Sequence, residues 1–239
     1  MSVIEIKHPE LLTVIDENGK LHSGGDQLWF PREGFIPKGA CGATTASNIL
    51  AYMLRTRPEL YAFAQESGLD GIEPPVMHTS DQKENTETTV HESNPVNKNS
   101  YIEFMKKVYR FLYPRVGGLM ANHFMEGMTE LAESYSLPVV AESMSVPIAL
   151  TRRPAFADVA GFVNSSLCAD IPVAFLILSG GGVEHLDTWH WVTITALDEG
   201  SKQGRILDNT RPFWANIGVW LETSIMGGSF IRLQVLQEA

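Results

Sequence analysis

The 239-residue chain lacks the features of several special classes of protein. It has two cysteines, Cys41 and Cys168, and two are too few for a disulfide framework, so we expect two free thiols in a reducing compartment. Its longest apolar run, PVAFLIL at 172–178, is far too short to cross a bilayer. The N-terminal residues mix acidic and polar side chains with apolar ones, so they lack the apolar core of a signal peptide. These absences predict a soluble, cytoplasmic protein.

Positive charge is also scarce. The chain has 18 Lys and Arg against 28 Asp and Glu, which gives a net charge of −10. A chain with this balance offers no basic patch, so neither nucleic acid nor a membrane surface is expected as a partner. Apolar residues make up 44% of the sequence, which is enough for a sizeable core. We expect a single domain over residues 1–239.

Hydrophobic patterns divide the chain into a helical first half and a strand-rich second half. Apolar residues at helical spacing follow Cys41 and are bounded by Pro58, which predicts a helix between them. Helical spacing recurs at 101–113, 122–135 and 154–167, and strand patterns lie at 172–178, 189–198, 204–208 and 228–236. Helices followed by strands indicate an α+β fold.

A long polar segment interrupts the helical half. Residues 68–100 have no apolar periodicity, and a stretch of that length is either an insertion or a functional loop over a site. We expect a polar insertion or lid at about 68–100.

Cys41 occupies an unusual place for a structural cysteine. It stands in KGACGATTASNILAYM, one step before the apolar stripe, at the predicted start of a helix. Backbone N–H groups and the positive end of the helix dipole favour a thiolate there. Gly42 and Ala43 are small, so a substrate could approach the sulfur closely. The position predicts a nucleophile, and a nucleophilic thiolate needs a histidine and a group that orients it.

His190 is the histidine best placed for that role. It begins the strand pattern HWVTITALD, so the sheet would hold it in place. The next strand, GRILDNT, ends in Asp208 and Asn209. Antiparallel pairing would return that end to the start of the His190 strand. We expect Asp208 to orient the imidazole, with Asn209 as the alternative.

These three motifs resemble the papain superfamily of cysteine peptidases. GACGATTASNILAYM is similar to the nucleophile helix, HWVTITALD to the histidine strand and ILDNT to the strand of the orienting acid. The resemblance is closest to the bacteriocin-processing (double-glycine-leader) branch. It is a similarity of short motifs and covers roughly residues 24–56 and 172–209. It implies a papain-like fold in which a helical lobe packs on an antiparallel sheet.

The resemblance also implies roles for individual residues. Cys41 would be the nucleophile, His190 the proton carrier and Asp208 the orienting acid. The Cys41 backbone N–H and the side chain of Gln27, in GGDQLWFP, would hold the oxyanion. Gln27 lies further before the cysteine than the superfamily's glutamine does, Ala43 stands where proline is common, and the 68–100 insertion matches nothing in the pattern.

The implied reaction is cleavage of a peptide or amide substrate through a thioester. Two alternatives remain open: an acyltransferase that uses the same three residues, and a papain-like binding module without activity. The histidines form no metal motif, because none pairs with another at i, i+4 spacing beside a carboxylate. His185 and His190 share a region, but the sequence indicates no third ligand. We therefore expect neither a metal ion nor a cofactor.

Overall fold

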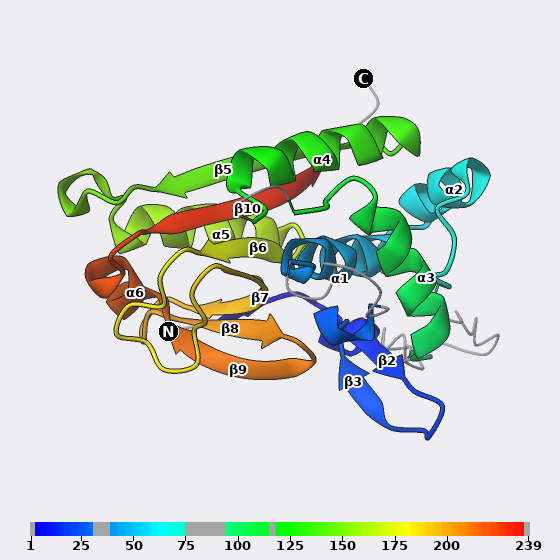
Figure 1. Cartoon of the computed structure of the whole chain (residues 1–239), viewed down its shortest axis with the longest axis horizontal. Helices are drawn as coiled ribbons and strands as arrows, with labels where there is room; N and C mark the ends of the chain where they lie inside the picture. The colour runs from blue at the N-terminus through cyan, green and yellow to red at the C-terminus, as the bar shows by residue number, and fades with distance from the viewer. Residues whose placement is uncertain (1–2, 31–38, 75–93, 115–117, 237–239) are drawn as a thin grey trace, which may run out of the picture.

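A computed structural model describes residues 3–30, 39–74, 94–114 and 118–236. Its centre is an antiparallel sheet in the order β5-β10-β6-β7-β8-β9, with β1 paired to the end of β7 (Figure 1). With helices packed against an antiparallel sheet, the fold is α+β. The strands of this sheet are β1 (Val3–Glu5), β5 (Val139–Val146), β6 (Val173–Ile177), β7 (His190–Asp198), β8 (Gln203–Asp208), β9 (Arg211–Asn216) and β10 (Gly228–Val235).

Helices cover both faces of this sheet. One core cluster joins α1, α3 and α4 to one face, and a second joins α5 and α6 to the other. Strand β6 shows the division, because Ala174 and Leu176 belong to the first cluster while Val173, Phe175 and Ile177 belong to the second. The helices are α1 (Cys41–Thr56), α2 (Pro58–Ser67), α3 (Lys98–Tyr109), α4 (Ala121–Ser134), α5 (Phe156–Cys168) and α6 (Ile217–Thr223).

Helix α1 begins and ends where the sequence predicts. Its first residue is Cys41 and its last is Thr56. Arg57 then takes an extended backbone conformation, as expected for a residue that precedes proline, and Pro58 opens α2. All but the last residue of α1 are buried, so this helix forms the centre of the first core cluster.

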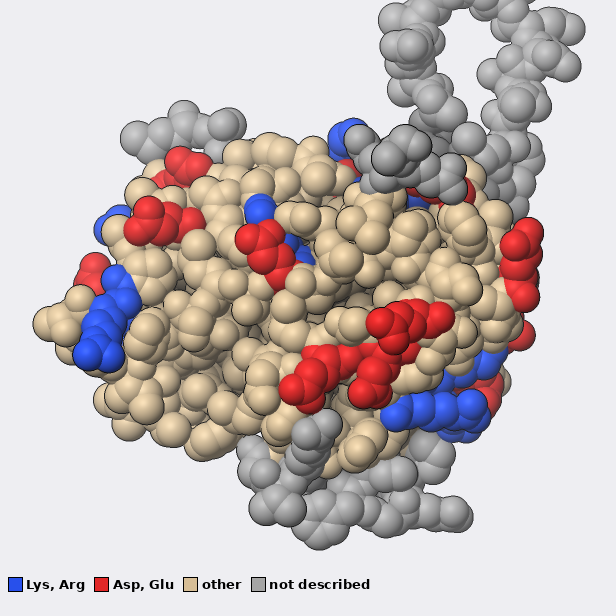
Figure 2. Space-filling model, turned by 90° about the horizontal axis from the view of Figure 1, so that it is seen from above, with Lys and Arg blue, Asp and Glu red and all other residues tan. Residues whose placement is uncertain are grey.

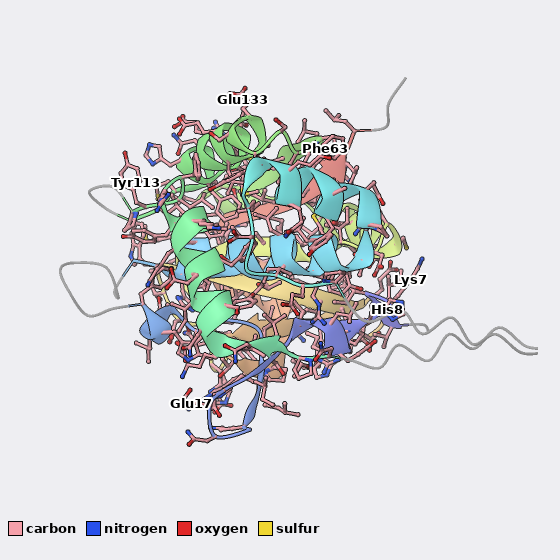
Figure 3. The ribbon with its side chains drawn as sticks, turned by 90° about the vertical axis from the view of Figure 1, so that its right-hand side faces the viewer. Lys7, His8, Glu17, Phe63, Tyr113 and Glu133 are labelled. Carbon is pink, nitrogen blue, oxygen red and sulfur yellow. The ribbon has the colours of Figure 1, made fainter. Side chains whose placement is uncertain are left out.

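A smaller sheet lies beside the main one, in the order β3-β2-β4. Its strands are β2 (Thr13–Ile15), β3 (Leu21–Ser23) and β4 (Val96–Asn97), and β4 runs parallel to β2. The hairpin of β2 and β3 projects from the body of the protein, with Glu17 near its tip (Figure 3). Short 3-10 helices complete the chain: η1 (Pro9–Leu12), η2 (Gln27–Trp29) and η4 (Leu150–Arg152).

Several elements of the structure are missing from the prediction made from the sequence. Strands β5 and β9 are absent from the sequence-based assignment, and they form the two edges of the main sheet. Most of their side chains are not buried, so they lack the apolar alternation that marks a half-buried strand. Helix α6 is also absent from it, because its seven residues are too few to establish a period.

The two cysteines are both free, as expected. Cys168 is exposed as the last residue of α5. The apolar residues of α5 point into the second core cluster, and the helix turns its final residue outward.

The charged residues of one face are mainly acidic. Seen from above, several acidic side chains gather on the surface (Figure 2), and α4 on this side presents Glu126, Glu130 and Glu133 to solvent. Within the described part of the chain, no helix has the length and apolar character needed to cross a membrane.

Candidate active site

The first turn of α1 places Cys41 at a tightly packed junction. Its side chain is nearly covered, with the residue 8% exposed. A Cβ on the next residue, Gly42, would lie only 2.4 Å from Cδ2 of Leu119 and 3.3 Å from Cδ1 of Trp191. Trp191 is itself fixed, because its Nε1–H donates to the carbonyl of Leu119 at 2.7 Å and its ring stacks on Phe124. Glycine at 42 therefore lets the helix start close to β7.

A buried asparagine two turns further along α1 joins this helix to its surroundings. The Asn48 amide donates to Thr193 Oγ1 on β7 at 3.2 Å. Its carbonyl oxygen accepts from the hydroxyl of Tyr101 and from the backbone N–H of Gly25, both at 2.8 Å. Because a buried polar side chain is costly unless it is hydrogen-bonded, these bonds hold α1, β7, α3 and the Gly25 segment in one arrangement.

His190 and Asp208 form a short hydrogen bond at the adjoining ends of two strands. Strands β7 and β8 are antiparallel, so the last residue of β8 returns to the first residue of β7. The Nε2–H of His190 donates to Oδ1 of Asp208 at 2.7 Å. The side chains are 8% and 14% exposed, so only a small part of the pair is in contact with solvent.

Cys41 is the second side chain that acts on the imidazole of His190. Its effect is strong enough to help raise the pKa of His190. Since Nε2 faces Asp208, Nδ1 is the ring nitrogen left for the thiol. Burial alone lowers the pKa of His190, but the interactions with Asp208 and Cys41 outweigh burial and raise that pKa to about 10. The surroundings thus favour an imidazolium between a thiol and a carboxylate.

The turn after Asp208 separates the two predicted orienting residues. Asn209 and Thr210 both have positive φ, 42° and 68°, as the tight hairpin between β8 and β9 requires. Asn209 Oδ1 accepts from the backbone N–H of Gln27 at 3.2 Å. The histidine is therefore bonded to Asp208, while Asn209 holds the segment that carries Gln27.

Gln27 lies close to this turn. It opens η2, whose preceding residue Asp26 caps the helix by accepting from Leu28 N–H. Its side-chain Oε1 is buried and has no hydrogen-bond partner among the described residues. The described contacts connect Gln27 to Asn209, and none of them joins its side chain to Cys41.

Two cavities border the site, one at Cys41 and the other at Asp208. One of about 40 Å³ lies against Cys41 and is lined by small and apolar residues, namely Gly39, Gly118, Leu119, Leu176, Trp189 and Trp191. The other, of about 820 Å³, lies on the far side of Asp208, between the β2–β3 hairpin, η2 and the β8–β9 turn. Solvent can therefore reach the carboxylate from the larger cavity, while a small group could approach the sulfur from the other.

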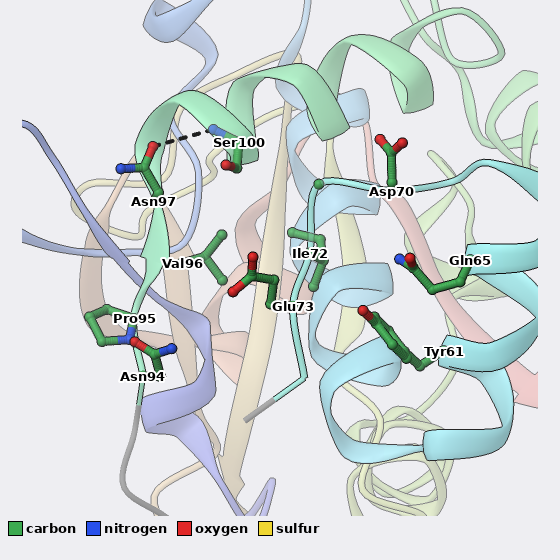
Figure 4. A pocket seen from close by; sticks show the side chains of 11 residues that line it. Tyr61, Gln65, Asp70, Ile72, Glu73, Asn94, Pro95, Val96, Asn97 and Ser100 are labelled. Atoms are coloured by element: carbon green, nitrogen blue, oxygen red, sulfur yellow. Dashed lines mark hydrogen bonds between the residues drawn. The ribbon is translucent and has the colours of Figure 1, made fainter. Parts of the chain in front are cut away.

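A further cavity, of about 380 Å³, lies at the opposite end of α1 (Figure 4). Arg55, in the last turn of α1, donates to the carbonyls of Leu11 and Asn94. It follows Cys41 by fourteen residues, or about 21 Å along the helix axis. The described ends of the 68–100 insertion thus lie remote from Cys41, and its middle, 75–93, lies outside the described residues. The cavity is lined by residues 70–73 and 94–97 with Tyr61, Gln65 and Ser100.

Sequence reasoning missed several residues that build the site. Asn48 and Trp191 fix the spacing of α1 and β7, but a polar residue in a helix or an aromatic residue in a strand carries no specific signal. Asp187 was missed too, although it lies three residues before His190. Its carboxylate, a ring nitrogen of His190 and a carboxylate oxygen of Asp208 lie within 4.8 Å of one another.

Comparisons with known proteins find little similarity to this chain. No protein-family model matches the chain, and no curated protein matches it. The solved structures that match include the N-terminal peptidase C39-like domain of the toxin secretion ATP-binding protein from Vibrio parahaemolyticus, with 10% sequence identity and a TM-score of 0.29. The alignment covers 55% of this chain and 82% of that one. A similarity this low says nothing about the activity of this protein. The proposal below therefore rests on the geometry of the site.

Proposed function

We propose that the protein is a cysteine-dependent peptidase or amidase of papain-like type. Cys41 is the nucleophile, His190 the proton carrier and Asp208 the residue that orients the imidazole. The observation that carries the proposal is the position of His190, which is hydrogen-bonded to the Asp208 carboxylate at 2.7 Å and whose pKa is raised by Asp208 and by the Cys41 thiol at the start of α1. A nucleophile, a base and an orienting acid in contact are the arrangement that acyl transfer needs.

The reaction follows from these contacts. With its proton transferred to His190 Nδ1, the Cys41 sulfur attacks the amide carbon, and the carbonyl electrons move onto oxygen. When that intermediate collapses, the C–N bond breaks and His190 gives its proton to the leaving amine. The resulting thioester is then attacked by water, which His190 deprotonates, and the acid product leaves as Cys41 is restored as the thiol.

The oxyanion requires donors near the first turn of α1. The backbone N–H of Cys41 is one, since the first N–H groups of a helix have no partner within it. We assign the second to the side chain of Gln27. Its support is the hydrogen bond that holds its backbone to Asn209, next to Asp208, and the donor would be the Nε2–H of its side-chain amide.

The cavity beside Cys41 supports a preference for small residues at the cleaved bond. With a volume of about 40 Å³ and a lining of small and apolar residues, it favours a small side chain there, and shape limits of this kind set specificity. This restriction agrees with the sequence resemblance to the double-glycine-leader branch.

The test is hydrolysis of a fluorogenic peptide library that varies the residue on the acyl side of the bond. Cleavage of Gly or Ala substrates, abolished in Cys41→Ala, would support the proposal. Repeating the assay with an added primary amine separates hydrolysis from transfer, because transfer would give the amide of that amine as product. Absence of cleavage and of amide formation with every substrate would contradict both reactions.

A further inference from the structure

A second carboxylate accompanies the His190–Asp208 pair. Asp187 belongs to the loop that enters β7, and its carboxylate lies within 4.8 Å of both a His190 ring nitrogen and an Asp208 oxygen. Asp187 is exposed, whereas His190 is buried. Asp187 and Asp208 both line the cavity of about 820 Å³, so solutes can reach this group of three from solvent.

We propose that Asp187, His190 and Asp208 bind a divalent transition-metal cation of the Zn²⁺ type, which withdraws the imidazole from proton transfer. One nitrogen and two oxygen donors are ligands that Zn²⁺ accepts, and water can complete its coordination. In a tetrahedral site with bonds of about 2.0–2.2 Å, donor atoms stand roughly 3.4 Å apart. The three donors already lie within 4.8 Å of one another, and the side chain of the exposed Asp187 can turn toward the other two.

The chemistry of the donors selects the kind of cation. Imidazole nitrogen suits zinc, copper, nickel and iron, whereas Mg²⁺ and Ca²⁺ prefer sites made only of oxygen. When the cation binds, a metal–nitrogen bond replaces the N–H bond of His190 and one proton is released to solvent. No oxidation or reduction is involved.

The consequence for activity rests on the proposed function. With the cation on Nε2, the nitrogen that faces Asp208, the imidazole remains as a neutral ring that carries its one proton on Nδ1. It can then no longer accept the thiol proton of Cys41, and as a neutral ring it is too weak an acid to protonate the leaving amine. The cation would therefore act as a reversible inhibitor, and its effect would depend on Asp187, a residue that the proposed reaction does not use.

The direct test is isothermal titration of ZnCl2 into the full chain carrying Cys41→Ala and Cys168→Ser. This background has no thiol to bind zinc and needs no catalytic activity. The expected result is a Zn²⁺ site whose affinity falls at least tenfold when Asp187→Asn is added, with no comparable binding of MgCl2. Glu184→Gln is the matched control, since Glu184 lies on the same loop in an exposed pair with His185 at 3.5 Å.

Three results would overturn the proposal. They are equal Zn²⁺ affinity with and without Asp187→Asn, loss of binding in Glu184→Gln instead, and binding that occurs only when Cys41 is present. Circular dichroism checks that each variant is folded, and Cys41→Ser replaces Cys41→Ala if the latter is not.

A second arm measures inhibition in the protein with its native thiols. We expect Asp187→Asn to raise the Zn²⁺ concentration for half-inhibition of peptide cleavage at least tenfold, with each variant compared with its own metal-free rate. Failure of the proposed function would look different, because no variant would cleave peptides while the titration still showed the Asp187-dependent site. Unchanged half-inhibition in Asp187→Asn would contradict the regulatory role.

Discussion

Two His–Asp pairs of the protein have similar geometry and different surroundings. His190 donates to Asp208 at 2.7 Å, and His22 Nε2–H donates to Asp16 at 3.0 Å. The side chains of the second pair are 13% and 9% exposed, so burial does not distinguish the two. The difference is the third partner, which is the Cys41 thiol for His190 and the edge of the Trp29 ring for His22.

The comparison shows what a histidine and an aspartate can do with and without a nucleophile. Asp16 also accepts from the backbone N–H groups of Asn18 and Lys20, so its pair with His22 closes the β2–β3 turn and fixes a local shape. The pair on β7 and β8 faces a helix start that carries a thiol. The same side-chain chemistry therefore supports structure in one place and acid–base chemistry in the other.

The largest expected effect distinguishes the two histidines directly. His190→Ala should lower kcat for peptide cleavage on the order of 10⁴–10⁶-fold, because the thiol loses its base and the leaving amine its acid. His22→Gln should change kcat by no more than a few-fold. Steady-state kinetics on one peptide substrate provides the measurement, and similar losses in both variants would contradict the assigned difference.

The two aspartates give the next test. Asp208→Asn keeps the shape of the side chain but removes the charge that orients and stabilises the imidazolium, so kcat should fall on the order of 10²–10⁴-fold. Asp16→Asn is the matched control and should leave kcat nearly unchanged. If Asn209→Ala instead caused the loss and Asp208→Asn had little effect, the orienting residue would be Asn209.

Gln27 should have a smaller effect. Gln27→Ala removes one oxyanion donor, which typically costs about 10²–10³-fold in kcat with KM little changed. Gln27→Glu keeps the size and replaces the amide donor by an acceptor, so it should be at least as impaired. Activity close to wild type in both variants would remove Gln27 from the site.

The hydrogen bond between His22 and Asp16 in the β2–β3 hairpin should affect the stability of the protein at low pH. The hydrogen bond from His22, followed by the backbone bond from Lys20, lowers the pKa of Asp16 from 3.8 to about 2. A carboxyl with a depressed pKa stabilises the fold above its unfolded value, so this contribution is complete above pH 3.8 and is lost as the pH falls through 2. Thermal unfolding of wild type and Asp16→Asn should differ at pH 6 and converge near pH 2. A difference that persists at pH 2 would contradict this.

The sequence predicts the parts of this account that depend on local pattern. The start of α1 at Cys41, the buried strand β6 and the return of β8 to β7 follow from apolar spacing, proline and strand alternation. The edge strands β5 and β9 could not be predicted in this way, because strands with few buried side chains show little apolar alternation. Asp187 and Asn48 also escape prediction, because their partners lie in β8, β7 and α3 and only the tertiary fold brings them together.

The role of the Cys41 thiol as the partner of His190 is tested most directly by alkylating Cys41. The rate of reaction with iodoacetamide is measured from pH 5 to 10 in Cys168→Ser, with and without His190→Ala. Because the pKa of His190 is raised to about 10, the imidazolium persists through neutral pH, and a positive charge beside a cysteine makes its sulfur more reactive. The account predicts rapid labelling already at pH 6 that His190→Ala abolishes. Labelling that rises only near pH 8.5, the usual pKa of a free thiol, and that ignores His190 would contradict it.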